Sequence, residues 1–224
     1  MELTSEIKTK INNLKTPFLL QNLDKVVENY NLMQKVIKPD DVYYAIKANK
    51  HPAVLKILHK AGCKFEVNNK IELQEIMKVG HDPKKVINSA PAKLISDIKY
   101  MYKKGVTKFA YDSKDEIDKL KEYAPKSQVY LRIHTSNAGS GQELNTKYGV
   151  SYQEAPELLQ YALDKGLTPF GTTFTVGSQC TNLKNWEEGI RKSAKLFEQF
   201  PTLNTLNLGG GYPIDYEAAS LDPK

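Results

Sequence analysis

The feature that most limits what this chain can fold into is a repeated alternation of short apolar runs and amphipathic segments. Each run is rich in β-branched or aromatic residues, and each following segment has apolar residues at i, i+3 and i+4. Gly62, Gly80, Gly105 and Gly166 each follow such a segment, as glycines that end helices do. Alternating βα units favour a parallel sheet whose strands are joined by helices.

The runs predict seven strands and the segments predict the helices that join them. The strands are Tyr43–Ala48, Phe65–Val67, Val86–Ser89, Phe109–Tyr111, Gln128–Ile133, Gly171–Val176 and Leu203–Leu208. The helices are Ala53–Ala61, Lys70–Val79, Leu94–Lys103, Lys114–Tyr123, Tyr152–Lys165 and Trp186–Phe200. A short strand at Pro17–Leu20 and a helix at Leu23–Ile37 are predicted before them.

This count predicts an α/β fold of the (β/α)8 barrel type, with an open doubly wound sheet as the structural alternative. Only 13 residues follow Gly211, so the barrel is expected to lack one βα unit unless the N-terminal segment replaces it. We expect one barrel domain over residues 1–224, with the first strand and helix at 16–37 and the βα repeats at 42–211.

Composition excludes several classes of protein. Hydrophobic residues make up 40% of the chain and charged residues 26%, which is ordinary for a globular protein. The sequence has no run of 18 apolar residues and no apolar secretory signal, so we expect a cytoplasmic protein without a membrane partner. The two cysteines cannot form a disulfide framework, and no C-x-x-C or H-E-x-x-H spacing predicts a metal site.

The net charge of +6 does not indicate a nucleic-acid partner. Of the 32 basic residues only Arg132 and Arg191 are arginines, and the lysines are scattered over many predicted helices. Nucleic-acid-binding proteins more often cluster arginine, so we interpret the lysines as a solvated surface. Arg132 is exceptional because it lies in an apolar strand.

Lys47 is the first candidate for chemistry, because it lies at the end of the first predicted strand. Catalytic residues of βα barrels follow the carboxyl ends of the strands. Burial of the amine there would lower its pKa and make it a nucleophile for a carbonyl group. A lysine that merely extends to solvent is the equally weighted alternative.

Gly209, Gly210 and Gly211 follow the last predicted strand, where barrels often bind phosphate. Backbone N–H groups can approach a phosphate closely where no Cβ intervenes. Ser178 follows the preceding strand and could donate to the same phosphate. Together with Lys47, this set predicts a phosphorylated carbonyl cofactor held by a lysine, which is pyridoxal 5′-phosphate (PLP).

The chain resembles the fold-type III PLP-dependent decarboxylases, the ornithine, lysine, diaminopimelate and arginine group. The matching stretches are Tyr44–Asn49, Phe65–Leu73, Ala90–Lys93, Asp112–Ser113, Leu131–Ile133, Lys147–Gly149, Val176–Ser178 and Gly209–Pro213. The stretch from Arg132 to Thr135, followed after a short loop by Lys147–Gly149, is more similar to the ornithine/lysine branch.

This resemblance implies a barrel of the alanine racemase-like type and roles for individual residues. It implies that Lys47 forms the Schiff base, that Ser178 and Gly209–Gly211 bind the phosphate, and that Arg132 lies beside the cofactor ring. Glu66 stands where the family has an aspartate near the lysine.

Three departures from the family affect these expectations. Thr175 stands where the family has a histidine stacked on the ring, and threonine cannot stack. The family's Glu-Pro-Gly-Arg stretch, whose Glu pairs with the ring nitrogen, is not in the sequence. The C-terminal β-domain is also absent, with the Cys and Asp that complete the partner subunit's site.

We therefore expect decarboxylation of ornithine or lysine to a diamine for polyamine biosynthesis. The substrate would be a small amino acid, and the protein a homo-oligomer or a chain completed by another. The alternatives are a non-catalytic decarboxylase-like regulatory protein, an N-terminal part of a longer or split enzyme, and a single-domain PLP carrier barrel. His59 and His81 are expected at the surface, and His134 could face the site.

Overall fold

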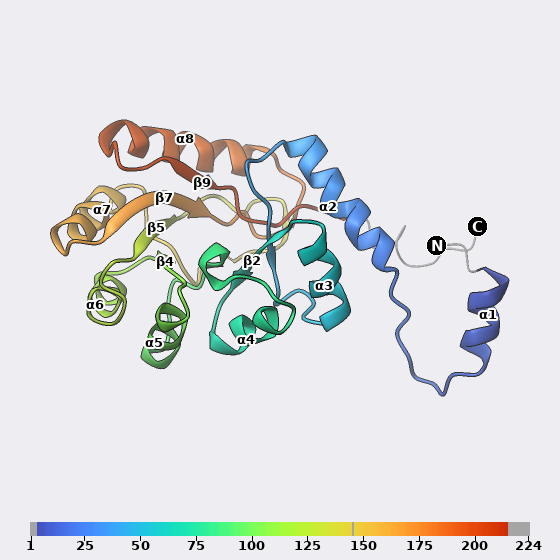
Figure 1. Ribbon diagram of the computed structural model, residues 1–224. Helices are drawn as coiled ribbons and strands as arrows, with labels where there is room; N and C mark the ends of the chain where they lie inside the picture. The colour runs from blue at the N-terminus through green and yellow to red at the C-terminus, as the bar shows by residue number, and fades with distance from the viewer. Residues whose placement is uncertain (1–3, 145, 215–224) are drawn as a thin grey trace.

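The main feature of the computed structural model, which describes residues 4–144 and 146–214, is a curled sheet of parallel strands (Figure 1). Its seven strands follow the order β1-β2-β3-β4-β5-β7-β9. They are β1 Tyr43–Ala45, β2 Lys64–Val67, β3 Ile87–Asn88, β4 Lys108–Tyr111, β5 Gln128–Ile133, β7 Thr168–Phe174 and β9 Thr205–Asn207. β1 and β9 are the two edges, so the described residues form a half-barrel that does not close on itself.

Helices join successive strands along the outer side of the curl (Figure 1). These are α3 Pro52–Lys60, α4 Lys70–Lys78, α5 Ile95–Lys103, α6 Lys114–Tyr123, α7 Ala155–Asp164 and α8 Lys184–Gln199, with a 3-10 turn at Pro83–Lys85. Two more helices, α1 Ser5–Asn12 and α2 Leu23–Ile37, precede β1. Asn69 and Ser113 begin α4 and α6, because their side chains accept a hydrogen bond from the N–H three residues later. No helix among the described residues is both long and apolar enough to cross a membrane.

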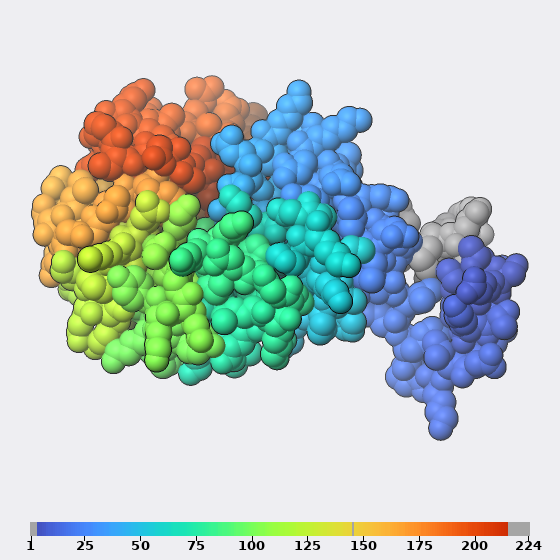
Figure 2. Space-filling view, viewed as in Figure 1, coloured from blue at the N-terminus to red at the C-terminus, as the bar shows by residue number. Residues whose placement is uncertain are grey.

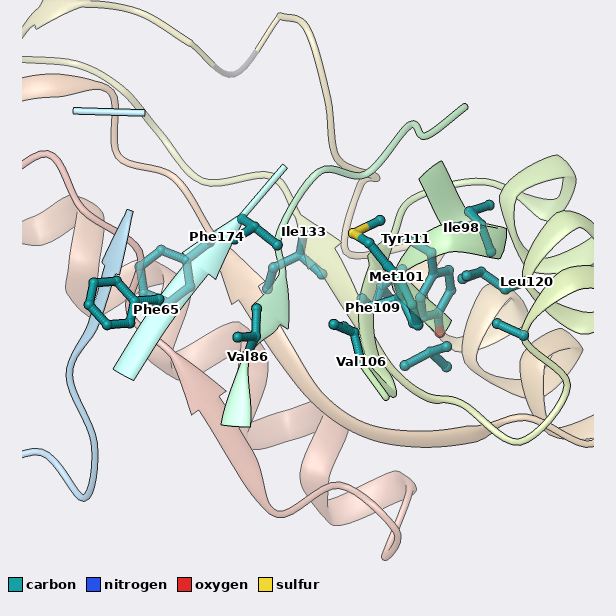
Figure 3. Close-up of a cluster of buried hydrophobic side chains, with 14 of the residues drawn as sticks. Phe65, Val86, Ile98, Met101, Val106, Phe109, Tyr111, Leu120, Ile133 and Phe174 are labelled. Atoms are coloured by element: carbon teal, nitrogen blue, oxygen red, sulfur yellow. The ribbon is translucent and has the colours of Figure 1, made fainter. Parts of the chain in front are cut away.

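The core lies between the sheet and these helices. In β2 the side chains of Phe65 and Val67 are fully buried, whereas Lys64 and Glu66 are only half-buried, as expected for alternate faces of a strand. Figure 3 shows Phe109 and Tyr111 of β4 beside Met101 of α5. Full burial of such a side chain contributes about 2 kcal/mol. One face of the strands therefore packs against the helices. The opposite face is also filled in part, by a second buried cluster of Ala110, Tyr130 and Phe170.

The predicted fold class is confirmed, as are the seven strands and the helices between them. The strand predicted at Pro17–Leu20 is wrong: no strand forms there, and Leu19 is 87% exposed. Its apolar run has no neighbouring strand among the described residues. The unpredicted helix α1 begins where the Thr4 hydroxyl accepts from the Ile7 N–H, and it lies away from the body of the molecule (Figure 2). Residues 1–3, 145 and 215–224 of the predicted domain lie outside the described residues.

A second, two-stranded sheet was not predicted. β6 (Ser140–Gln142) pairs antiparallel with β8 (Ser178–Cys180), with Gln142 opposite Ser178. Neither segment has the apolar alternation of a strand. The pair forms because the loop after β5 folds back onto the segment after β7, which is a contact between distant parts of the chain.

Lys93 stabilises the loop between β3 and α5 from inside the protein. Its amine forms an ion pair with Glu116 at 2.9 Å and donates to the carbonyl oxygens of Ala90 and Ala110. Burial lowers the pKa of Lys93 to about 8, although the Glu116 charge opposes this shift. Removing one partner of such a buried pair is far more destabilising than the pair itself is stabilising.

The expected surface position of His81 is wrong. The side chain is only 6% exposed, its ring centroid lies 4.8 Å from that of Phe65, and its Nδ1 lies 3.2 Å from Nδ1 of His59. The His81 N–H donates to the Ile76 carbonyl oxygen at the end of α4, which turns the ring inward. Burial, together with the charges of His59 and Lys85, lowers the pKa of His81 to about 4, and Asp82 opposes this.

We expect stability to fall in mild acid because of His81. Between pH 6.5 and 4 the unfolded chain binds a proton that the folded chain does not, so the free energy of unfolding decreases as pH falls, by about 2 kcal/mol at pH 5. Urea unfolding at pH 7 and pH 5 measures this. His81→Leu should lose most of this difference, whereas His51→Ser, at the exposed start of α3, should keep it. Equal losses in the unaltered chain and His81→Leu would contradict the assignment.

Candidate functional site

Lys47 lies in a turn at the carboxyl end of β1. The strand ends at Ala45, and the Ala48 N–H donates to the Ala45 carbonyl oxygen at 3.1 Å, which closes the turn. The predicted extension of the strand to Ala48 is therefore wrong. Lys47 is exposed, which agrees with the alternative of a lysine that extends to solvent and not with a buried amine. In the open half-barrel no described segment covers this turn, and the amine remains accessible to a ligand.

Glu66 lies on the neighbouring strand, opposite Ala45. Its half-buried carboxylate accepts a hydrogen bond from the Ser89 hydroxyl. Burial raises the pKa of Glu66, and the Ser89 hydrogen bond and the charges of Lys47 and Arg132 oppose that shift. Both cations therefore lie close enough to Glu66 to act on its charge.

Arg132 is near the end of β5, opposite Thr173 of β7. Its guanidinium carbon lies 5.6 Å from the centroid of the Tyr148 ring, a cation–π distance. Burial lowers the pKa of Arg132, and the charges of Asp112 and Glu66 oppose this. Asp112 also accepts from the Gly149 N–H at 2.8 Å, so it ties the loop that carries Tyr148 to the end of β4. The result is a cluster of alternating charges over three strand ends.

The three glycines after β9 pack against the segment after β7. Gly209 and Gly211 have positive φ values, 69° and 88°. A Cβ on Gly209 would lie 2.3 Å from the Phe174 carbonyl oxygen, and one on Gly211 would lie 2.3 Å from that of Gly177. Only glycine fits either position. A Cβ on Gly210 would meet nothing within 4 Å, so the middle of the loop faces open space.

This loop presents several hydrogen-bond donors to one place. The Cys180 N–H donates to the Gly211 carbonyl oxygen at 2.8 Å and holds the loop beside Ser178. Within residues 4–144 and 146–214, neither the Ser178 hydroxyl nor the N–H groups of Gly210 and Gly211 have a hydrogen-bond partner. Unpaired backbone N–H groups beside a hydroxyl form a concavity that suits an anion such as phosphate.

Thr175 lies between these glycines and β7. It is half-buried, and its carbonyl oxygen accepts from the Thr135 hydroxyl at 3.0 Å and from the Asn137 side-chain amide at 2.9 Å. The side chain is too short to cover a ring. The position is held firmly by its backbone, whichever side chain it carries.

Lys47 also borders a surface cavity of about 490 Å³. The cavity lies between the turn after β1 and the first turns of α4, where Asn69, Ile71 and Glu72 line it. Glu72 accepts from the Asn68 N–H at 2.7 Å, so this carboxylate is fixed against the end of β2. A ligand attached to Lys47 therefore has room on this side.

The structure brings the sequence-predicted residues together in two groups. Lys47, Glu66 and Arg132 form the first, and Ser178 with the three glycines forms the second, beside Thr175. Both groups follow the carboxyl ends of parallel strands and so lie at the same end of the half-barrel. No hydrogen bond among the described residues joins them directly.

Sequence reasoning assigned no role to Ser89, Asp112, Tyr148 or Asn137. Each lies at a strand end or in the following loop, which is the only signal that could have indicated them. Cys180 is buried, and Trp186 is 8% exposed and stacks on Tyr212 with ring centroids 5.3 Å apart. His134 is half-buried, and its carbonyl oxygen accepts from Lys192 at 3.1 Å.

Comparison with known proteins explains the arrangement. Residues 23–223 match the family model described as pyridoxal-dependent decarboxylase, pyridoxal binding domain. The chain belongs to the pyridoxal-dependent decarboxylase family. It is 35% identical over 222 residues to the lysine/ornithine decarboxylase of Selenomonas ruminantium, a match that covers 97% of this chain and 56% of that protein. It is also 31% identical to antizyme inhibitor 2 of Xenopus laevis, over 88% of this chain and 44% of that protein.

Solved structures of this family have the same fold. A lysine decarboxylase from Selenomonas ruminantium superposes with a TM-score of 0.88 at 34% identity, over 96% of this chain and 57% of that one. A lysine/ornithine decarboxylase from Vibrio vulnificus, complexed with putrescine, superposes with a TM-score of 0.85 at 26% identity, over 96% and 59%. The chain thus spans about half the length of the relatives it matches.

The residues present fit a phosphorylated pyridoxal cofactor. The glycine loop packs so closely on the segment after β7 that Gly209 and Gly211 admit no Cβ, and its middle faces open space with unpaired donors for a phosphate. An accessible lysine lies at the same end of the strands, beside a carboxylate and a guanidinium. The donors suit a phosphate, the lysine amine suits an aldehyde, and the carboxylate and guanidinium suit a polar ring.

Proposed function

We propose that this chain is the cofactor-binding barrel of a PLP-dependent decarboxylase that acts on ornithine or lysine. The observation that carries the proposal is the glycine loop packed on the Thr175–Ser178 segment, with Lys47 at the same end of the sheet. Ser178 and Gly209–Gly211 would hold the phosphate, and Lys47 would hold the aldehyde carbon. Family membership and the names of the most similar relatives support the same reading.

The chain's own residues would bind and orient the reacting groups. Bound PLP supplies an electron sink for the pair of electrons that remains when the substrate's carboxylate leaves as carbon dioxide. Lys47 provides a primary amine that is accessible from solvent. Glu66, held by Ser89 and flanked by Lys47 and Arg132, would place a carboxylate beside the ring, and Arg132 would balance its charge. A proton must then replace the lost carboxylate on the same carbon.

The proposed substrate is a basic amino acid with a primary amine at its distal end. A relative is named lysine/ornithine decarboxylase, and related structures hold putrescine or cadaverine, which are diamines. The proposed product is therefore a diamine that enters polyamine biosynthesis. We also propose a cytoplasmic protein that works as a homo-oligomer or with a chain that supplies the rest of the relatives' length.

A non-catalytic role is the second candidate, and Thr175 favours it. The side chain removes a contact that the family makes with the ring, and antizyme inhibitors are among the similar relatives. Such a protein would bind a partner and release no carbon dioxide. Carbon dioxide release from L-ornithine and L-lysine by the chain together with its completing partner separates the two candidates.

Titration with PLP tests the proposed cofactor, with the single tryptophan as the reporter. Trp186 stacks on Tyr212, the residue after the glycine loop, so a ligand at the loop should change its fluorescence. We expect saturable PLP binding, and several-fold tighter binding by Thr175→His, because a ring contact contributes about 1 kcal/mol. Thr181→His, at an exposed position, should not tighten it. No saturation in any variant would refute the proposed function, and equal affinities would show that the ring does not lie against Thr175.

A further inference from the structure

The segment that carries Ser178 depends on another loop for its position. Beyond β7 the segment has left the main sheet, and its Gly177 is so close to Ser140 that a Cβ there would lie 2.5 Å from the Ser140 hydroxyl oxygen. Ser178 itself pairs with Gln142 of β6. The placement of one half of the phosphate cradle is therefore set by the loop after β5.

Asn137 is at the centre of that loop, and it is 2% exposed. Its side-chain amide donates to the Thr175 carbonyl oxygen at 2.9 Å, and its side-chain oxygen accepts from the Leu144 N–H at 2.7 Å. Its backbone oxygen accepts from the Ser140 hydroxyl at 2.7 Å. Through its side chain and its backbone oxygen together, Asn137 thus links the segment before Ser178 to both ends of β6.

These contacts require both a donor and an acceptor on one short side chain. Aspartate would keep the acceptor and lose the donor to Thr175, and alanine would lose both. Either change leaves a buried polar group without this partner, which costs more than an ordinary hydrogen bond contributes. Loss of this hydrogen bond would release the Thr175 backbone, which directly precedes Val176–Ser178.

We propose that Asn137 is a positioning residue for phosphate binding: it holds the Thr175–Ser178 segment where Ser178 and the Gly209–Gly211 loop can contact one phosphate group. The inference rests on the proposed function, because the phosphate is that of the proposed cofactor. Asn137 acts through Thr175 and Ser178 and not by touching the ligand.

The test compares PLP with pyridoxal, which lacks the phosphate. The ratio of the two affinities, measured by Trp186 fluorescence, isolates what the phosphate contributes. We expect Asn137→Ala and Asn137→Asp to lower that ratio about tenfold while pyridoxal binding is unchanged. Asn88→Ala is the matched control, since Asn88 is also buried and donates to a carbonyl oxygen, that of Val67, far from this loop.

The outcomes separate this inference from the proposed function. Ser178→Ala should also lower the ratio. If Ser178→Ala lowers it and the Asn137 variants do not, Asn137 has no positioning role. If the unaltered chain binds PLP no better than pyridoxal, the cradle itself is refuted. If the Asn137 variants do not fold, Thr135→Val removes the other donor to the Thr175 oxygen and should lower the ratio in the same direction; an unchanged ratio there would overturn the proposal.

Discussion

Replacing Lys47 with alanine is expected to abolish covalent attachment of PLP to this chain. Lys47 is the accessible amine beside Glu66, and an alanine there leaves no nucleophile for the aldehyde. Borohydride reduction followed by peptide mass spectrometry locates the adduct. Lys50→Ala is the matched control, because this lysine lies three residues away, is exposed and borders the same cavity.

The two variants should differ in whether they keep the specific covalent PLP adduct. Lys50→Ala should keep the adduct on the peptide that contains Lys47, and Lys47→Ala should show only the low, unselective labelling of surface lysines. An adduct of equal yield in Lys47→Ala would mean that another lysine holds the cofactor. The 30 lysines of this chain make that control necessary.

The 224-residue chain by itself is expected to associate and to be a poor decarboxylase. Among residues 4–144 and 146–214, no strand pairs with the outer edge of β1 or of β9, whereas parallel sheets are normally closed or covered. The sequence also lacks the Glu-Pro-Gly-Arg stretch whose Glu, by resemblance, pairs with the ring nitrogen. Loss of such preorganised charge slows catalysis by orders of magnitude. Light scattering measures the mass, and carbon dioxide release from L-ornithine and L-lysine measures the rate.

A monomer with ordinary activity would contradict this expectation. A stable single chain that turns over either amino acid at about 1 per second or faster would show that neither edge pairing nor the absent stretch is needed. Adding a chain that supplies the remaining length of the relatives provides the positive control. Activity that appears only on addition would support the proposed partner.

The sequence predicted the βα units well, because hydrophobic periodicity and helix caps involve only neighbouring residues. The helix predicted at Lys114–Tyr123 forms with those bounds, capped by Ser113. The strand predicted at Tyr43–Ala48 is shorter, because a turn closes where the Ala48 N–H donates to the Ala45 carbonyl oxygen. The strand predicted at Pro17–Leu20 does not form, because strand propensity has no effect without a neighbouring strand to pair with.

The sequence predicted which residue types stand at the candidate site, but it did not predict how buried each side chain is. Strand-end position and residue chemistry indicated Lys47, Ser178 and the glycines. Burial could not be inferred. The sequence left a buried and an exposed Lys47 amine equally open, and the structure shows Lys47 exposed, whereas His81, expected at the surface, is buried. Exposure is a property of what packs around a residue, so it is not encoded in the residue's own segment.

The sequence alone was enough to predict the seven parallel strands with their joining helices, the resemblance to the family and the chemical types of the candidate site residues. Periodicity, helix caps and short motifs are contained within a few consecutive residues, which is why they can be read directly. Only the tertiary structure decided that Asn137 holds Thr175 and that Ser89 holds Glu66. Those contacts join residues 38 and 23 positions apart, and they exist only after the curled sheet has brought the ends of its strands together.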